Sequence, residues 1–182
     1  MKSILRTTIT AMGMGLAVSS AAAQELKTAV LAGGCFWCVE SDFDQIPGVI
    51  ETVSGYTGGT LDAPTYKQVS AGGTGHREAV EITYDPSLVD YEELLNAFWS
   101  SVDPTDAGGQ FCDRGEPYQT AIFVADDGER QIAEASKTAA EKGLGQKIVT
   151  PIEDAGRFFP AEGYHQDYYL KNPVRYKYYR WS

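Results

Sequence analysis

The chain is organised around residues 29–40, Ala29-Val30-Leu31-Ala32-Gly33-Gly34-Cys35-Phe36-Trp37-Cys38-Val39-Glu40. The apolar run at 29–32 predicts a buried strand, and the two glycines after it permit a tight turn. Apolar residues then recur at helical spacing, at Phe36, Val39, Phe43 and Ile46. The pattern predicts a strand, a turn and a helix, with Cys35 where the helix begins.

Cys35 and Cys38 form a Cys-x-x-Cys motif at this helix start. Free backbone N–H groups and the positive end of the helix dipole favour a thiolate there. A free thiol titrates at about 8.5, and we expect the helix start to lower the pKa of Cys35 by a unit or more. The alternative is that both cysteines are small buried apolar side chains.

The N-terminal residues 1–23 have the features of a secretory signal peptide. Lys2 and Arg6 are positively charged, residues 9–18 are apolar, and Ala21-Ala22-Ala23 supplies small residues for cleavage before Gln24. The apolar stretch is too short for a transmembrane helix. We therefore expect an exported protein, periplasmic or secreted, whose mature form has no membrane segment.

The remaining residues, 24–182, suit one domain with a sizeable core. The full chain carries a net charge of -10, so it should not bind nucleic acid or anionic lipid. Three cysteines are too few, and an odd number, for a structural disulfide framework in an exported protein. At least one thiol is therefore left over, or two of them are catalytic.

The rest of the chain alternates between predicted strands and helices. Strands are expected at 49–54, 76–84, 120–125 and 148–149, and a short helix around His165. Asp90 and Glu93 form a capping box for a helix whose apolar face is Leu94, Leu95, Phe98 and Trp99. This order indicates an α/β or α+β domain in which helices pack on one mixed sheet.

Two predictions concern the C-terminal half. A helix is expected over Glu129–Lys142, with Gly143 after it and with Ile132, Ala135 and Ala139 facing inward. From Tyr164 to Ser182 the chain is rich in tyrosine, which we interpret as an irregular tail whose amphipathic rings wrap the domain.

Glu78 is the acidic residue with the most informative position. In the predicted strand it has the same parity as Val80, Ile82 and Tyr84, so it points toward the same face. A carboxyl at the edge of a buried face has a raised pKa and can hold a proton near neutral pH. The alternative is a glutamate at the strand end that turns into solvent.

A Cys-x-x-Cys motif also occurs in zinc sites, and a cysteine at a helix start can serve a hydrolase. A zinc site would need two more ligands, and the remaining candidates, Cys112, His76 and His165, are scattered singly. A cysteine hydrolase would use Cys35 with one of the two histidines as base, but neither has a distinctive setting.

The ordered motifs of the chain resemble the peptide-methionine sulfoxide reductase A family. The first is Gly34-Cys35-Phe36-Trp37 with Glu40, and the match runs through nearly the whole of residues 24–182. The further motifs are Gly55-Tyr56-Thr57-Gly58-Gly59, Pro64-Thr65-Tyr66, Thr74-Gly75-His76-Arg77-Glu78-Ala79-Val80, Asp103-Pro104-Thr105-Asp106, Asp113-Arg114-Gly115 with Tyr118, Phe159-Pro160-Ala161-Glu162 with His165-Gln166-Asp167-Tyr168, and Lys171-Asn172-Pro173.

The resemblance implies a two-layer α/β sandwich with a ferredoxin-like core and reduction of methionine S-sulfoxide, free or in proteins. It implies no metal and no bound organic cofactor. Cys35 would be the nucleophile and Glu78 the proton donor. The remaining site residues are the apolar pocket for the substrate methyl, Phe36 and Trp37, and the groups that hold the sulfoxide oxygen, Tyr66, Asp113 and Tyr118.

The chemistry agrees with these roles. A sulfoxide sulfur is a poor electrophile until its oxygen is protonated, which a neutral Glu78 can do while Cys35 attacks. Cys35 then remains as a sulfenic acid, and a nearby thiol condenses with it to a disulfide that an external dithiol reduces. Many family members carry the resolving cysteine in a C-terminal tail, but none follows Pro173 here. We expect Cys38 to resolve, with Cys112 as the alternative.

The sequence leaves two alternative functions open. One is a thioredoxin-like dithiol oxidoreductase, although Phe36-Trp37 between the cysteines fits that class poorly. The other is a non-catalytic redox or metal-binding module. For the reductase we expect a monomer whose substrates are oxidised proteins and free methionine sulfoxide. Its reductant should be a thioredoxin-like protein, which dithiothreitol can replace.

Overall fold

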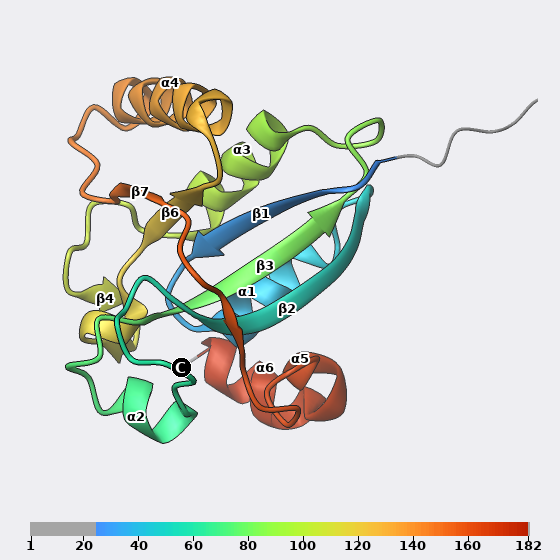
Figure 1. Ribbon diagram of the computed structural model, residues 1–182, viewed down its shortest axis with the longest axis vertical. Helices are drawn as coiled ribbons and strands as arrows, with labels where there is room; N and C mark the ends of the chain where they lie inside the picture. Colours follow the sequence, from blue (N-terminus) through green and yellow to red (C-terminus); the bar gives the residue numbers. More distant parts are fainter. Residues whose placement is uncertain (1–24, 182) are drawn as a thin grey trace, which may run out of the picture.

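A six-stranded sheet forms the centre of the protein in a computed structural model that describes residues 25–181 (Figure 1). The expected signal peptide, residues 1–23, lies outside the described residues. The strand order is β7-β6-β1-β3-β2-β8, and β6 and β7 pair in parallel while the other neighbours are antiparallel. The strands are β1 (Lys27–Ala32), β2 (Val49–Thr57), β3 (Arg77–Tyr84), β6 (Ala121–Val124), β7 (Ile152–Asp154) and β8 (Phe159–Pro160).

The predicted ferredoxin-like core is confirmed by the order of these elements. β1 leads through α1 (Phe36–Phe43) to β2, and β3 leads through α3 (Tyr91–Ser101) to β6. These form the β-α-β-β-α-β unit of that fold. Apolar side chains of α1 and α3 pack with those of the central strands in one buried cluster, which includes Leu31, Phe36, Phe43, Ile82 and Phe98.

The start of α3 is capped as the sequence predicts. The Asp90 carboxylate accepts from the Glu93 backbone N–H at 2.8 Å, and the Glu93 carboxylate accepts from the Asp90 N–H at 2.9 Å. A cap of this kind stabilises a helix by about 1 kcal/mol. At the other end, the Trp99 indole N–H donates to Ser136 Oγ at 2.8 Å, which ties α3 to α4 (Asp127–Leu144).

The predicted inward face of α4 is wrong. Ile132, Ala135 and Ala139 are exposed, and the buried positions are Ala133 and Ser136. The predicted face contains the bulkiest apolar residue of this stretch, Ile132. The face that packs in the structure instead has small side chains, and Ser136 on it accepts a hydrogen bond from Trp99 of α3. Successive residues of a helix are about 100° apart, so an error of one position turns the face to solvent.

Two neighbouring predictions also need correction. The glycine that ends α4 is Gly145, in the left-handed region at φ 66°, and not Gly143, which lies inside the helix. The strand expected at 148–149 is absent there, and β7 begins at Ile152. The Ile148 and Val149 N–H groups donate to the Glu141 side chain and the Pro104 carbonyl, so this segment is bonded to a helix and a loop.

The predicted irregular tail is wrong as well, because the chain ends in two helices, α5 (Tyr168–Lys171) and α6 (Pro173–Trp181). Pro173 stands at the first position of α6, where its fixed φ is pre-set for a helix. The Tyr169 hydroxyl donates to Asp44 at 2.9 Å, which holds α5 against the end of α1. The short helix expected around His165 begins at Tyr168.

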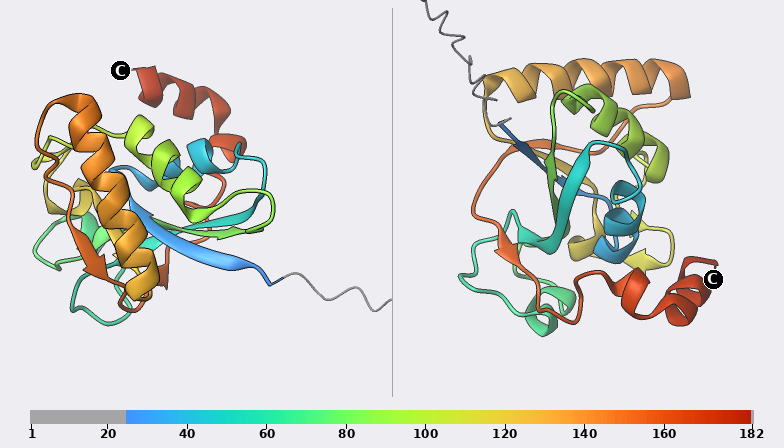
Figure 2. Two further views of the ribbon diagram at one scale, coloured as in Figure 1. Left: turned by 90° about the horizontal axis from the view of Figure 1, so that it is seen from above. Right: turned by 90° about the vertical axis from the view of Figure 1, so that its right-hand side faces the viewer.

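Figure 2 shows α4 and α6 at opposite ends of the molecule, with the sheet between them. α6 lies beside α1, because Arg180 of α6 donates to Asp42 of α1. Both helices are at the end of the molecule that carries Cys35. Within residues 25–181, no helix is long and apolar enough to cross a membrane.

Candidate active site

Cys35 is the residue that precedes α1, and a sharp turn places it there. Gly34 has φ 87°, a conformation that glycine adopts freely. A Cβ at Gly34 would lie 2.5 Å from the Gln110 side chain, so only glycine fits. The Cys35 carbonyl accepts from the N–H groups of Cys38 and Val39, at 3.0 and 3.3 Å, and so opens the helix. The predicted strand, turn and helix are confirmed.

Glu78 lies on β3 and points inward, as its parity predicts. Its side chain is buried, and Oε2 accepts from the Phe36 backbone N–H at 3.0 Å. Burial raises the pKa of Glu78 to about 8, with a smaller contribution from the negative charge of Asp113. The prediction of a carboxyl that can hold a proton near neutral pH is confirmed, and the alternative of a solvent-exposed glutamate is excluded.

The two cysteines of the motif interact directly. The Cys35 thiol is hydrogen-bonded to the Cys38 sulfur, and this bond, burial and the nearby Glu78 raise the pKa of Cys35 above its usual value. The same bond, with the help of Arg180, lowers the pKa of Cys38 to about 7. The prediction of a lowered pKa at Cys35 is therefore wrong for the resting site, because the hydrogen bond to Cys38, burial and the nearby Glu78 together outweigh the helix start. Of the two sulfurs, that of Cys38 therefore ionises first as the pH rises.

Aromatic rings surround the start of α1. The ring centroids of Phe36 and Trp37 are 6.3 Å apart, and those of Phe36 and Tyr66 are 6.5 Å apart. The Trp37 indole N–H donates to His165 Nδ1 at 3.1 Å, and its ring stacks on Tyr168 with centroids 3.7 Å apart. The hydrogen bond to His165 and the stacking on Tyr168 together fix the orientation of the Trp37 ring. His165 accepts this bond as a neutral ring, since burial lowers its pKa.

Tyr66 and Tyr118 meet near Glu78. Their hydroxyls are hydrogen-bonded to each other, and burial together with the Glu78 carboxylate raises the pKa of both. They are therefore neutral phenols that can donate hydrogen bonds to a bound oxygen. Glu162 positions Tyr66, because its carboxylate accepts from the Tyr66 backbone N–H at 3.0 Å and from the Tyr56 hydroxyl at 2.9 Å.

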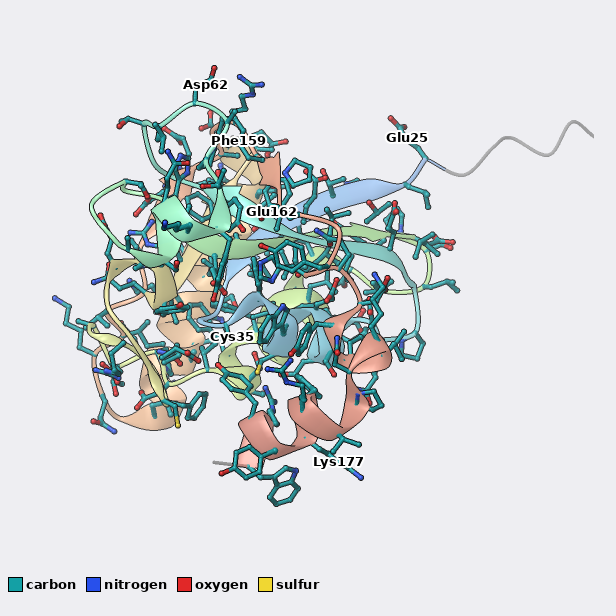
Figure 3. All side chains as sticks on the ribbon, turned by 90° about the horizontal axis from the view of Figure 1, so that it is seen from below. Glu25, Cys35, Asp62, Phe159, Glu162 and Lys177 are labelled. Atoms are coloured by element: carbon teal, nitrogen blue, oxygen red, sulfur yellow. The ribbon has the colours of Figure 1, made fainter. Side chains whose placement is uncertain are left out.

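A cavity of about 480 Å³ opens beside Cys35. Figure 3 shows Cys35 between the start of α1 and the C-terminal helix that carries Lys177. Asp113, on β5 (Asp113–Arg114), also faces this space, and its carboxylate accepts a hydrogen bond from the Tyr179 hydroxyl. The cavity is lined mainly by the two cysteines of the motif, the turn around Cys112 and the end of α6: Cys35, Cys38, Asp42, Phe111, Cys112, Asp113, Tyr179, Arg180 and Trp181.

Comparison of the sequence with known protein families shows which family the chain belongs to. A family model described as "Peptide methionine sulfoxide reductase" matches residues 27–182. The chain belongs to this family. It is 53% identical to "Peptide methionine sulfoxide reductase MsrA 2" of Rhizobium meliloti (strain 1021) over 160 residues, 88% of this chain and 80% of that protein.

Solved structures agree with this assignment. Mxr1 from Saccharomyces cerevisiae in reduced form has 32% sequence identity and a TM-score of 0.78, and the match covers 82% of this chain and 87% of that one. Mxr1 in complex with Trx2 has the same fold, with 19% identity and a TM-score of 0.55 over 83% of this chain and 90% of that one. Membership of the methionine sulfoxide reductase family excludes the thioredoxin-like and the non-catalytic alternatives.

His76 and Cys112, which the sequence offered as possible zinc ligands, have other positions in this reductase. His76 holds a loop, because its Nδ1 accepts from the Gly59 N–H at 3.2 Å and its Nε2 lies 2.8 Å from the Leu61 carbonyl. Cys112 is exposed in the turn between β4 (Gly109–Gln110) and β5 and lines the cavity. Across residues 25–181, no three His, Cys, Asp or Glu side chains are grouped to bind a metal ion.

Sequence reasoning missed the part of α6 that reaches the reductase site. The Tyr179 hydroxyl contacts both Asp113 and the Cys35 sulfur, and Arg180 contacts Cys38. The only signal was the aromatic and basic residues at helical spacing after Pro173, which we interpreted as a wrapping tail.

Glu40, the last residue of the first motif, supports Trp37 indirectly through residues 167 and 168. It is buried and accepts from the Asp167 backbone N–H at 3.1 Å. Asp167 has a positive φ of 53°, and the next residue, Tyr168, stacks on Trp37. Glu40 therefore helps to place the aromatic ring that supports Trp37.

Proposed function

We propose that Cys35 and Glu78 carry out thiol-dependent reduction of methionine S-sulfoxide, the oxidoreductase reaction that membership of the family assigns to this chain. The observation that supports these roles is the placement of a buried, proton-holding carboxyl against the start of the helix that Cys35 opens. A single site then supplies both a nucleophilic sulfur and an acid.

In the first step the Cys35 sulfur attacks the sulfoxide while Glu78 gives its proton to the sulfoxide oxygen. The Cys35 proton moves along its hydrogen bond to the Cys38 sulfur. Methionine leaves, the oxygen stays on Cys35 as a sulfenic acid, and Glu78 is left as a carboxylate. The negative charge that began on Cys38 thus ends on Glu78.

The side chains around the two reacting groups supply the substrate site. The half-buried Trp37, packed against the buried ring of Phe36, presents an apolar surface to the methyl group on the sulfoxide sulfur. The hydroxyls of Tyr66 and Tyr118, with Asp113, hold the sulfoxide oxygen directly or through water. The two hydroxyls donate to the oxygen, whereas the Asp113 carboxylate, which only accepts, acts through a bridging water. The hydroxyls act where charge develops on the oxygen, which is where they contribute most to the rate.

In the second step Cys38 condenses with the Cys35 sulfenic acid, a disulfide forms and water leaves. The hydrogen bond between the two sulfurs favours Cys38, because little chain movement is needed. Cys112 lines the same cavity and is the alternative resolving thiol.

Mapping the disulfide after one turnover tests this mechanism. We expect equimolar methionine and a Cys35–Cys38 disulfide, identified by peptide mass after thiol blocking. We also expect Cys38→Ser to stop recycling by a dithiol protein, with Cys112→Ser as the matched control that recycles normally. A Cys35–Cys112 disulfide, or normal recycling by Cys38→Ser, would reverse the choice of resolving residue.

An external dithiol must reduce the disulfide, since the reaction consumes two thiols for each sulfoxide. We propose a thioredoxin-like protein, in line with the complex that yeast Mxr1 forms with Trx2. No bound cofactor takes part, and dithiothreitol can replace the protein reductant. Substrates are free and protein-bound methionine sulfoxide, and we propose that the catalytic unit is residues 24–182 acting as a monomer.

We propose further that the enzyme is exported and repairs oxidised proteins outside the cytoplasm. The support is the signal-peptide pattern of residues 1–23, with a charged start, an apolar stretch and small residues before Gln24. N-terminal sequencing of the protein from its native host should find a start near Gln24. An intact Met1 would overturn export and, with it, the expectation of a reductant outside the cytoplasm.

A further inference from the structure

We propose that Arg180 is a positioning residue that holds the Cys38 sulfur as a nucleophile for the second step of the reaction. The inference rests on the proposed role of Cys38 as the resolving thiol and adds the residue that prepares it. Arg180 lies near the C-terminal end of α6, far in the sequence from the motif it serves.

The guanidinium of Arg180 is fixed from one side. Its Nη2 donates to both oxygens of Asp42, at 3.0 and 2.9 Å. Asp42 lies on α1 four residues after Cys38, so the two side chains are neighbours on one face of the helix. Anchored in this way, the guanidinium also donates a hydrogen bond to the Cys38 sulfur.

Arg180 opposes several groups that disfavour charge on Cys38. These are the burial of the Cys38 sulfur, the carboxylate of Asp42 on α1 and the carboxylate of Glu78 on β3, whereas the hydrogen bond with Cys35 favours the charge. Tyr176, the other α6 residue that faces Cys38, is a neutral phenol. Arg180 is the cation of this cluster, and its contact lowers the pKa of Cys38. The Arg180 side chain is 36% exposed, so the effect depends on direct contact with the sulfur.

The contact matters in the second step. Cys38 is then a thiol, and it must lose its proton as its sulfur bonds to the Cys35 sulfur. That proton leaves with the sulfenic oxygen as water, so the sulfur–oxygen bond breaks as the disulfide forms. A guanidinium at the Cys38 sulfur stabilises the negative charge that passes through it. In the first step the Cys38 thiolate acts as a base that takes the Cys35 proton. Loss of Arg180 lowers the thiolate fraction of Cys38 but makes its sulfur a stronger base, so this step should slow less than the second.

The test separates the two steps in Arg180→Gln. Rapid mixing with one equivalent of methionine S-sulfoxide follows methionine formation, and sulfenic acid trapping follows disulfide formation. At pH 7 we expect disulfide formation to slow roughly 3–10-fold, because a smaller thiolate fraction is only partly offset by greater nucleophilicity. We expect the slowing to vanish at high pH, where Cys38 ionises without help, and Arg180→Lys to restore part of the rate.

The matched control is Arg175→Gln, which removes the same charge from the exposed part of the same helix. It should leave disulfide formation unchanged. Equal effects of the two substitutions, or an equal loss of both steps in Arg180→Gln without a shift of the pH profile, would overturn the role of Arg180. If Arg180→Gln unfolds, Arg180→Lys carries the test, with a smaller slowing of disulfide formation that also vanishes at high pH.

Peptide mapping in the same samples keeps two failures apart. A Cys35–Cys38 disulfide that forms at the normal rate in Arg180→Gln contradicts the role of Arg180 alone. A Cys35–Cys112 disulfide in the wild-type enzyme contradicts the proposed role of Cys38, and the role of Arg180 with it.

Discussion

Replacing Cys35 with serine abolishes methionine formation from methionine sulfoxide while the fold stays intact. A serine hydroxyl is a far weaker nucleophile than a thiolate, and it cannot form the sulfenic acid that holds the transferred oxygen. The fold should tolerate the change, since Cys35 occupies the N-cap of α1, a position that serine favours. The measurement is methionine formed in a single turnover, with far-ultraviolet circular dichroism as the check on folding.

Cys112→Ser is the control for this experiment, because it removes an exposed thiol of the same cavity. It should form methionine at the wild-type rate in the first turnover. If Cys35→Ser kept more than a few per cent of the wild-type rate, Cys35 would not be the nucleophile.

Glu78→Gln slows the first step by roughly 10²–10⁴-fold, the usual effect of removing a general acid. The glutamine amide has almost the same shape and its oxygen can still accept from the Phe36 N–H, so the site should keep its geometry. Substrate binding should change much less than the rate. An unchanged single-turnover rate would mean that the proton comes from elsewhere, such as Tyr66 or Tyr118 through water.

The rate of the first step should also depend on pH in a defined direction. Glu78 has a pKa of about 8, so in the wild type the first step should slow as the pH rises through 8 and the carboxyl loses its proton. Glu78→Gln should lack this decline. Stability follows in the same direction, because a raised carboxyl pKa stabilises the fold at low pH and that stability falls as the pH rises from about 4.5 to about 8.

The sequence predicted those parts of the site that follow from local periodicity. The apolar run before Gly33 and the helical spacing after it place Cys35 between β1 and α1. The period of two in β3 directs Glu78 inward, and the Asp90 capping box begins α3 where expected. In each case one segment of chain contains the whole signal, so no distant contact is needed to interpret it.

The remaining features depend on contacts between distant segments. The pKa of Cys35 is raised by its hydrogen bond to Cys38 and then by burial and by Glu78 of β3, and these effects outweigh that of the helix start. The packed face of α4 is chosen by Trp99 of α3. The structure of α6 follows from its contacts with α1 through residues such as Arg180, which the local pattern of aromatic residues does not reveal.

The most direct test of the proposed function is product analysis with the separated epimers of methionine sulfoxide. With dithiothreitol as reductant, we expect the full-length enzyme to convert the S epimer to methionine and to leave the R epimer unreacted. The same preference should hold for a peptide that contains the S-sulfoxide. Equal consumption of the two epimers, or no methionine from the S epimer, would contradict the assignment.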